Sequence, residues 1–446
     1  MTLVRKRKEE ATVCRLLMNS YSQKIRTMLY DVLSPAVYWW REKKILKLEP
    51  ELEQHYQTII NSIRNRTDKR IRFGSYVMYD SDYGMDSAFQ IMKANPEQWS
   101  PKVVIIPDVS RGKEHALQIY QRTKAFFLKK YGREYVLDGW DLHSRYYDYL
   151  SLFDVVYYNN PYDQMAHKYH KICYGAKQNV LPIYVTYGYE ISSHFTYLRY
   201  QSTAINLFWK CYTDTRYSYR DYQKYQIRKG RNVTLSGYSK MDSYAAYSTE
   251  KSKKRKKILI SPHHTVVNSD LPLSNFLRFY KLILRLPEMF PDVDFIFRPH
   301  PLLFTTLINY KIWSKQQADA YLRRLKELHI EYSEGGDYFE VFQQADAIIN
   351  DSGSFTIEWL FTGKPGCFVR NPQLKAEQLT VLMRKALTEY TIAESEADII
   401  RFISSVAESE APASYTMKDW VRKNIAVNYP HAAEAITDDI LKEIFY

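Results

Sequence analysis

The feature that most constrains the fold of this chain is a repeated alternation between short apolar runs and longer amphipathic stretches. Short apolar runs that alternate with helical patterns are typical of parallel β-strands joined by helices. The alternation occurs in two series, which lie on either side of a block of basic residues. The pattern therefore predicts an α/β protein with two doubly wound domains.

The first series predicts a domain over residues 71–245, and the second predicts a domain over residues 256–385. A helical extension is expected over residues 1–70, and further helices over residues 386–446. The predicted strands are SYVMY (75–79), KVVII (102–106), DVVYY (154–158), LPIYVT (181–186), KILIS (257–261), VDFIF (293–297), DAIIN (346–350) and PGCFV (365–369).

The join between the two series is the segment KSKKRKK (251–257). Like charges are not buried together, so this segment is expected to be an exposed linker. In the second series a helix is expected from Ser274 to Met289, with Ser274 as its N-cap. Its predicted buried stripe is Leu273, Leu277, Tyr280 and Leu284.

Composition narrows the partners and the compartment. The net charge of +13 favours nucleic acid, acidic lipid headgroups or phosphate-bearing substrates. The 40 tyrosines suit wet clefts and membrane-adjacent surfaces, or reflect a compositional habit of the source. The four cysteines are far apart and form no CxxC pair, which fits a reducing compartment. No run approaches the roughly 18 apolar residues of a membrane span. We expect a cytoplasmic protein, with any membrane contact peripheral and at the inner face.

The most informative motif is IINDSGSFTIEWLFTGKP (348–365), where a strand ends in a small polar turn that leads into a helix. Backbone N–H groups and the helix dipole at such a turn can hold an anion. The motif predicts a phosphate site, although the serines could equally serve only as a helix cap. The predicted ligands are Asp351, Ser352, Gly353 and Ser354, with Glu358 one helical turn further on for ribose hydroxyls.

Two histidine motifs follow other predicted strands of the same domain. In RPHP (298–301), arginine and histidine can both donate to phosphate oxygens, although a lone histidine after a strand is usually structural. His263 and His264 follow the strand at 257–261, and one of them is a candidate acid, base or phosphate donor. No carboxylate or third histidine lies nearby in sequence at ligand spacing, so no metal is expected.

Together these segments resemble the CDP-glycerol glycerophosphotransferase family. RPHP, DYFEVFQQADAIINDSGSFTIEW (337–359) and GKP (363–365) resemble its C-terminal half, and IPDVSRG (106–112) and VTLSGYSKMD (233–242) resemble capsule and surface-polysaccharide relatives. The resemblance covers about residues 75–370 and implies a GT-B fold, with two doubly wound domains facing a cleft. It implies no separate cofactor. The implied donor contacts are Arg298 and His300 on the pyrophosphate, Ser352, Gly353 and Ser354 on phosphate, and Glu358 on the ribose.

The sequence departs from this family at the catalytic base. Members usually carry a Trp-His-Gly motif whose histidine is the base, but IYVTYGYEISSHF (183–195) has Tyr187 at that place, with Glu190 and His194 nearby. The base is therefore unassigned. The candidate acid–base residues are His263, His264, His300 and Glu190.

A basic and aromatic stretch, KCYTDTRYSYRDYQKYQIRKGR (210–231), is open to three interpretations. Basic residues among tyrosines can bind single-stranded nucleic acid by stacking and phosphate contacts. The stretch can also be a solvated amphipathic helix, or a surface for anionic polymer or membrane. Since no RNP, KH or helix-turn-helix signature accompanies it, nucleic acid is not expected as a partner. Peripheral membrane or anionic-polymer contact is favoured, and KSKKRKK points the same way.

The sequence thus predicts a transferase that moves glycerol phosphate, or a similar polyol phosphate, from a CDP-linked donor. The expected acceptor is a teichoic-acid-like or surface-polysaccharide chain, polymeric or lipid-linked. One alternative is a GT-B glycosyltransferase that uses a nucleotide-sugar. Another is a catalytically silent scaffold subunit of a polymer-synthesis complex, which the missing Trp-His-Gly histidine supports.

Overall fold

The structure is a computed structural model. It describes residues 23–193, 196–245, 255–267, 270–334, 338–409 and 416–446. The chain divides into two compact units, Met1–Leu52 and Glu53–Tyr446. Helix α2 (Gln23–Asn65) begins in the first unit and ends in the second. Among the described residues, no helix combines the length and the apolar character that crossing a bilayer requires.

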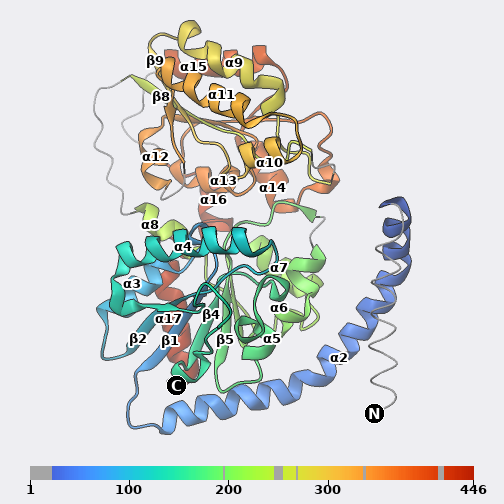
Figure 1. Cartoon of the computed structure of the whole chain (residues 1–446), viewed down its shortest axis with the longest axis vertical. Coiled ribbons are helices and arrows are strands. Elements are labelled where there is room, and N and C mark those ends of the chain that lie inside the picture. The colour runs from blue at the N-terminus through green and yellow to red at the C-terminus, as the bar shows by residue number, and fades with distance from the viewer. Residues whose placement is uncertain (1–22, 194–195, 246–254, 268–269, 335–337, 410–415) are drawn as a thin grey trace. The chain divides into compact units, whose positions relative to one another are not determined.

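The second unit contains two all-parallel sheets with helices on both sides of each (Figure 1). The first sheet has the strand order β3-β2-β1-β4-β5-β6-β7. Its strands are β1 (Ile71–Val77), β2 (Trp99–Ile105), β3 (Val136–Asp138), β4 (Val155–Tyr158), β5 (Leu181–Val185), β6 (Lys210–Thr213) and β7 (Val233–Leu235). Its helices are α3 (Asp86–Ala94), α4 (Lys113–Tyr131), α5 (Ile172–Gly175), α6 (Thr203–Leu207), α7 (Arg216–Tyr225) and α8 (Asp242–Ala245).

The second sheet has the order β10-β9-β8-β11-β12-β13. Its strands are β8 (Lys256–Ser261), β9 (Val293–Phe297), β10 (Glu331–Tyr332), β11 (Ala347–Asn350), β12 (Gly366–Val369) and β13 (Thr391–Ala393). The helices that follow β8 are α9 (Phe276–Met289), α10 (Leu303–Asn309), α11 (Lys315–Glu327), α12 (Phe339–Gln344), α13 (Ser354–Glu358), α14 (Val381–Ala386), α15 (Glu396–Glu408), α16 (Asp419–Asn424) and α17 (Ala432–Phe445). The predicted doubly wound α/β class is confirmed.

Three local expectations need correction. The segment at 251–257 was expected to be an exposed linker or surface loop up to the strand at 257–261, but β8 already includes Lys256, and residues 251–254 lie outside the described residues. Helix α9 begins two residues later than expected, and its N-cap is Asn275 rather than Ser274. Its buried residues are Phe276, Phe279, Leu282, Ile283 and Leu286, so the predicted stripe lies beside the true core face. Several apolar stripes fit this helix, and only contact with the sheet selects one.

The tyrosine content also has an unexpected role. Tyr76, Tyr157 and Tyr184 lie in neighbouring strands of the first sheet and are fully buried. Their rings act as core side chains because the phenol has a large apolar body. These tyrosines therefore fill the core instead of lining a wet surface.

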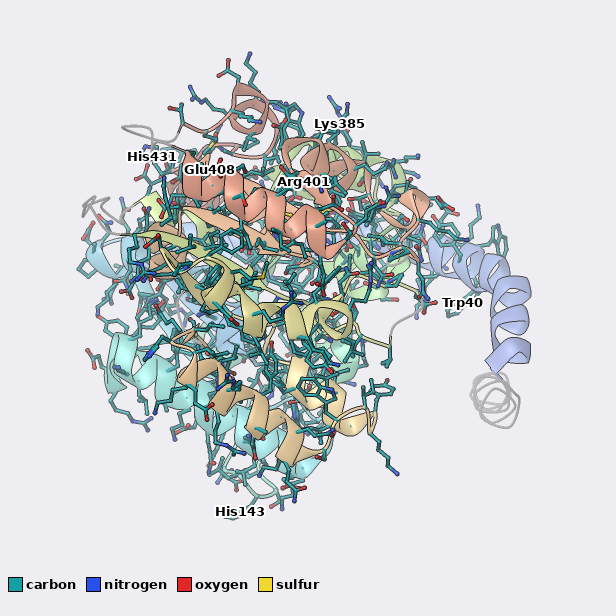
Figure 2. The ribbon with its side chains drawn as sticks, turned by 90° about the horizontal axis from the view of Figure 1, so that it is seen from above. Trp40, His143, Lys385, Arg401, Glu408 and His431 are labelled. Carbon is teal, nitrogen blue, oxygen red and sulfur yellow. The ribbon has the colours of Figure 1, made fainter. Side chains whose placement is uncertain are left out.

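The last helix returns to the first sheet. Asp439 of α17 accepts hydrogen bonds from Lys210 Nζ at 3.0 Å and from the Tyr212 hydroxyl at 2.9 Å, both on β6. By contrast, α15 packs beside the second sheet, and its Arg401 and Glu408 point outward (Figure 2). The sequence pattern predicted helices in this tail but not this return.

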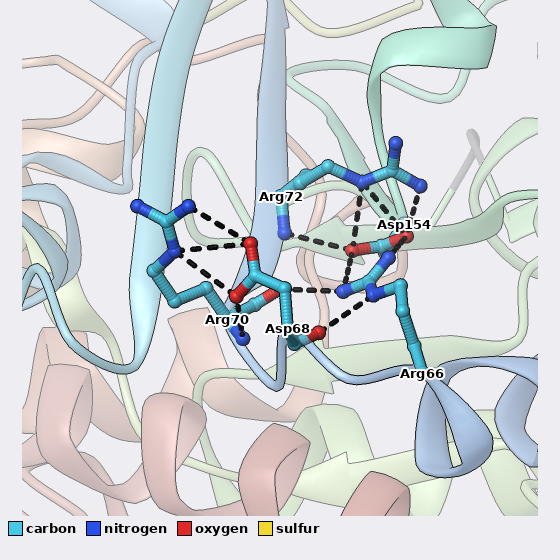
Figure 3. Close-up of polar contacts among 5 residues, drawn as sticks. All are labelled: Arg66, Asp68, Arg70, Arg72 and Asp154. Atoms are coloured by element: carbon cyan, nitrogen blue, oxygen red, sulfur yellow. Dashed lines mark hydrogen bonds and ion pairs between the residues drawn. The ribbon is translucent and has the colours of Figure 1, made fainter.

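A buried ion-pair cluster ties the end of α2 to the first sheet (Figure 3). Asp154, which is 3% exposed, precedes β4 and accepts from Arg66 Nη1 at 2.7 Å and from Arg72 Nη2 at 2.6 Å. The backbone N–H of Arg72 donates to the same carboxylate at 2.9 Å. Asp68 and Arg70 form an exposed pair beside it. The buried carboxylate thus holds three segments of chain together.

Candidate functional site

The second sheet joins two motifs that are distant in sequence, because β8 and β9 are neighbours. Parallel hydrogen bonding continues past the strand ends, where His300 N donates to Pro262 O at 2.9 Å. The loops after both strands therefore leave the sheet side by side. The His300 ring lies 5.0 Å from His263 and 4.2 Å from His264, centroid to centroid, and those two rings are 4.5 Å apart. We call these three residues the histidine cluster.

All three rings are held in the neutral form. Burial, together with the neighbouring His264, lowers the pKa of His300 to about 3. Burial likewise takes the pKa of His263 well below its ordinary value, with added repulsion from the other two rings. The pKa of His264 is lowered by burial and then by the positive charge of Arg111. At neutral pH the cluster is therefore a group of uncharged imidazoles.

Local hydrogen bonds fix the tautomer of two of these rings. The Leu302 N–H donates to His300 Nδ1 at 3.1 Å, so the proton of neutral His300 is on Nε2. The Thr265 hydroxyl oxygen already accepts from two backbone N–H groups, at 3.2 and 3.3 Å. Its own hydrogen is left to donate to His263 Nδ1, which is 3.1 Å away. His263 therefore also carries its proton on Nε2. Both rings present an N–H donor, which suits an anion.

Metal binding by the histidine cluster depends on the same tautomers. The ring nitrogens of the histidine cluster lie within 4.8 Å of one another, close enough to share a metal ion. This third histidine was not visible at ligand spacing in the sequence. However, a metal needs a nitrogen lone pair, and in His263 and His300 one nitrogen accepts a hydrogen bond while the other is protonated. His263 and His300 are therefore built as donors rather than as metal ligands.

We therefore expect calorimetric titration with Zn²⁺ to find no tight site in the wild-type protein, because binding would break both tautomer-fixing hydrogen bonds. Treatment with a chelator is likewise expected to leave the melting temperature unchanged. Tight Zn²⁺ binding that disappears in His263→Gln and His300→Gln would contradict the tautomer assignment.

Asp351, expected to be a phosphate ligand, has a different role. Its carboxylate accepts from the backbone N–H of His263 at 2.6 Å and from that of Asn275. Asp351 is 3% exposed and lines an apolar cavity of about 40 Å³ beneath the loop. Burial raises its pKa and the two backbone donors oppose the rise, with a net pKa of about 7. Asp351 therefore positions the loop that carries His263, and its expected part in the phosphate site stays a prediction.

The turn after Asp351 also differs from the expected anion site. Helix α13 has a single turn before a 3-10 turn takes over, so its dipole is much smaller than that of a long helix. A side chain on Gly353 would meet Ile191 at 3.3 Å, so this glycine allows packing between loops rather than approach of a ligand. Ser352 is buried and Ser354 is partly exposed beside Gly188. Phosphate binding by the two serines stays a prediction.

Two cations flank Tyr338, at the start of α12. Arg298 Cζ lies 5.9 Å from the centre of the ring, and Arg298 Nη1 donates to Ser333 Oγ at 2.6 Å. Lys240 Nζ, from the loop after β7 of the first sheet, lies 4.9 Å from the same ring. The carboxyl-end loops of both sheets therefore contribute positive charge at Tyr338, next to the strand end that carries His300.

Glu358 lies close to this group. It is 2% exposed, and its Oε1 is 3.4 Å from the Tyr238 hydroxyl. Its Oε2 is buried without a hydrogen-bond partner among the described residues. Burial raises the pKa of Glu358, while Lys240 and the phenols of Tyr338 and Tyr238 hold part of that rise back. A buried carboxylate oxygen of this kind is suited to a hydroxyl donor.

Tyr187 occupies the position where the resemblance expects a catalytic histidine. Its hydroxyl is 3.1 Å from that of Tyr162, which follows β4. Burial raises the pKa of Tyr187 well above its ordinary value, and the charge on Tyr162 adds to the rise. Tyr187 is therefore protonated at neutral pH and can donate a hydrogen bond but cannot accept a proton.

The side chain of Glu190 forms its hydrogen bond within its own loop. Its carboxylate accepts from the Ser192 N–H at 3.1 Å and lies in the field of the buried Arg199. Thr380 of the other domain donates to the Glu190 backbone oxygen at 3.0 Å, which fastens this loop to the C-terminal sheet. Glu190 is therefore poorly placed to act as a base, and His194 lies outside the described residues.

Sequence reasoning missed three charged or aromatic members of the site: Arg111, Lys240 and Tyr338. Arg111 and Lys240 belong to IPDVSRG and VTLSGYSKMD, which were noted only as resemblances. Both segments follow strands of the first sheet, so the strand-end rule used for the second sheet could have found them. Tyr338 lies in the stretch 337–359, which was noted for its resemblance without a role for this residue.

The basic and aromatic stretch at 210–231 is largely internal. Tyr212, Tyr222 and Arg228 are buried, and Lys210 pairs with Asp439. Stacking of successive bases needs a series of exposed aromatic rings. In this stretch, buried residues interrupt the exposed ones, so the rings do not form such a series. Only α7, within the stretch, matches the amphipathic-helix interpretation.

Comparisons with known proteins identify the fold. No family model matches the chain, and no curated protein matches it. A variant of the wall teichoic acid polymerase TagF, soaked with CDPG, has a TM-score of 0.54 at 14% identity, covering 92% of this chain and 98% of that one. A UDP-N-acetylglucosamine 2-epimerase has a TM-score of 0.51 at 13% identity, covering 84% of this chain and 96% of that one. The UDP-GlcNAc 2-epimerase of Methanocaldococcus jannaschii has a TM-score of 0.50 at 13% identity, covering 83% of this chain and 100% of that one. At these identities the likeness shows a shared GT-B-like fold.

Proposed function

We propose that this chain is a transferase that moves glycerol phosphate, or a similar polyol phosphate, from a CDP-linked donor to a teichoic-acid-like or surface-polysaccharide acceptor. The observation that carries the proposal is the histidine cluster with its two Nε2–H donors at the carboxyl edge of the second sheet. Ligands of doubly wound sheets bind beyond this edge. The fold likeness to TagF supports a CDP-linked donor, and the epimerase likeness supports nucleotide-linked substrates in general.

In the proposed reaction an acceptor hydroxyl attacks the β-phosphorus of CDP-glycerol. A new P–O bond forms to the acceptor, the bond to the α-phosphate oxygen breaks, and CMP leaves with that electron pair. Arg298, the histidine cluster and Ser354 would hold the pyrophosphate and the charge that spreads over it. Glu358 would receive the ribose hydroxyls on its unpaired oxygen.

Two alternatives remain. A nucleotide-sugar glycosyltransferase would use the same nucleotide contacts, because these do not identify the transferred group. A silent scaffold subunit is supported by Tyr187 in place of the family histidine. Peripheral membrane contact stays a prediction, since most of KSKKRKK lies outside the described residues.

The test is calorimetric binding, with assay of CMP release, over CDP-glycerol, CDP-ribitol, CDP, UDP-GlcNAc and a GDP-sugar. We expect selective binding of the CDP-linked compounds, and we expect Ser354→Ala to weaken it. Ser314→Ala is the control and should leave binding unaffected, because Ser314 is the N-cap of α11, away from the site. Selectivity for a UDP- or GDP-sugar would move the protein to the glycosyltransferases. Binding without CMP release would favour the scaffold, and no binding would reject a nucleotide site.

A further inference from the structure

Asp82 lies at the carboxyl edge of the first sheet, in the 3-10 turn Asp80–Asp82 that follows β1. Its loop is fixed by two others at the same edge. Lys240 Nζ donates to Ser81 O at 3.0 Å, and Ser239 Oγ donates to Gly84 O. Gly84 packs against the loop after β5, where an added Cβ would lie 3.3 Å from a backbone oxygen. The loop therefore sits against the turn that carries Tyr187.

The proposed transfer needs a proton acceptor, and the residues considered so far do not provide one on the acceptor side. Tyr187 is held protonated by burial. In His263 and His300 neither ring nitrogen has a free lone pair. Glu190 is bound to its own loop, and Asp351 lies beneath the donor loop.

The Asp82 side chain is partly buried within the turn Asp80–Asp82. Its Oδ1 accepts a hydrogen bond from the hydroxyl of the adjacent Ser81 at 3.0 Å. Burial raises its pKa, Asp80 adds to the rise, and Ser81, Lys240 and Arg111 oppose it. Carboxylates with raised pKa are stronger bases near neutral pH. The charged and titratable groups around Asp82 are Tyr79, Asp80, Arg111, Tyr157, Tyr162, Tyr187 and Lys240.

Asp82 is also linked to the donor side. Lys240 Nζ, which donates to Ser81 O at 3.0 Å, lies 4.9 Å from the centre of the Tyr338 ring on the donor side. The charge of Arg111 acts on both Asp82 and His264. Tyr162 and Tyr187, which feel the charge of Asp82, are 3.1 Å apart and offer a hydroxyl donor beside it. An acceptor hydroxyl bound beside this turn would meet the phenol pair and the Asp82 carboxylate.

Resting on the proposed function, we propose that Asp82 is the catalytic base that accepts the proton of the attacking acceptor hydroxyl. The Tyr162 and Tyr187 hydroxyls orient that acceptor. As the acceptor oxygen bonds to the β-phosphorus, its proton moves to the Asp82 carboxylate and CMP leaves with the bridging oxygen. The carboxyl group then loses its proton to solvent.

The experiment measures CMP release from CDP-glycerol, with glycerol 3-phosphate as a surrogate acceptor, over a pH series. We expect Asp82→Asn to lower kcat about 10²–10⁴-fold with donor affinity unchanged. Asp80→Asn is the matched control, since it removes a carboxylate from the same turn that faces Arg122 at 3.4 Å. The wild-type rate should rise with pH as Asp82 ionises, with its midpoint above the ordinary carboxyl range, and this limb should be lost in Asp82→Asn.

Other outcomes separate this inference from the proposed function. If the wild-type protein releases no CMP, the proposed function fails and this inference with it. If wild type turns over and Asp82→Asn keeps its rate and its pH limb, only the assignment of Asp82 is overturned. Loss of the limb in His264→Gln instead would place the base on the donor side and also overturn it.

Discussion

Replacing Asp154 by alanine is expected to lower the free energy of unfolding by about 3 kcal/mol. That is the lower end of the range for removing one partner of a buried ion pair. The arginines left behind can reach solvent, because Arg66 and Arg72 side chains are 26% and 45% exposed. The variant also leaves the Arg72 N–H without its acceptor. Urea unfolding followed by circular dichroism measures the difference.

The effect should depend on pH in a defined direction. Burial alone would raise the pKa of Asp154, but hydrogen bonds from Arg72 and Arg66 outweigh it, so its pKa is lowered below the ordinary 3.8. A lowered carboxyl pKa gives stability that is present above the unfolded value and is lost as pH falls through the folded value. The gap between wild type and Asp154→Ala should be constant at neutral pH and shrink in strong acid.

Asp68→Ala is the matched control for this cluster (Figure 3). Asp68 pairs with Arg70, and both side chains are 51% exposed. Exposed pairs contribute little because solvent screens them. We expect no measurable change in the urea midpoint, and an effect as large as that of Asp154→Ala would contradict the role given to burial.

Replacing His300 by alanine is expected to weaken binding of a CDP-linked donor about 10–100-fold, as loss of a hydrogen bond to a charged group implies. His300→Gln should weaken it far less, because the glutamine amide can place an N–H close to the position of Nε2. His143, exposed in a loop of the N-terminal domain, provides the control His143→Ala (Figure 2).

The alanine and glutamine variants distinguish a neutral donor from other roles. A metal ligand or an acid–base group would be lost in both substitutions to a similar degree. Equal losses, or a loss of affinity in His143→Ala, would contradict the assignment of His300 as a neutral donor. Calorimetry with CDP measures the affinities without turnover.

Sequence alone determined the class of the fold and located its more apolar strands, but it did not predict the short strands β3, β6, β10 and β13. VDFIF coincides with β9 and LPIYVT contains β5, because an apolar run between turns is a local pattern that a parallel sheet requires. It also placed RPHP and the histidine pair at strand ends, where a doubly wound sheet binds ligands. These conclusions need only the order of residues along the chain.

Only the tertiary structure decided which strand ends meet. His300 joins His263 because β8 and β9 pair, and nothing local encodes that pairing. Lys240 and Tyr338 come from different domains, so their contact has no sequence signal. Asp351 lies within a predicted site motif, yet its side chain turns toward the core.

The physical reason is the range of the interactions involved. Helix and strand periodicity reflects backbone geometry over a few residues, so it can be read from the chain. The direction of a polar side chain depends on which buried groups need a partner, such as the His263 and Asn275 N–H groups that claim Asp351. Likewise, the tautomers of the histidine cluster depend on Thr265 and Leu302, whose positions follow only from the folded loops.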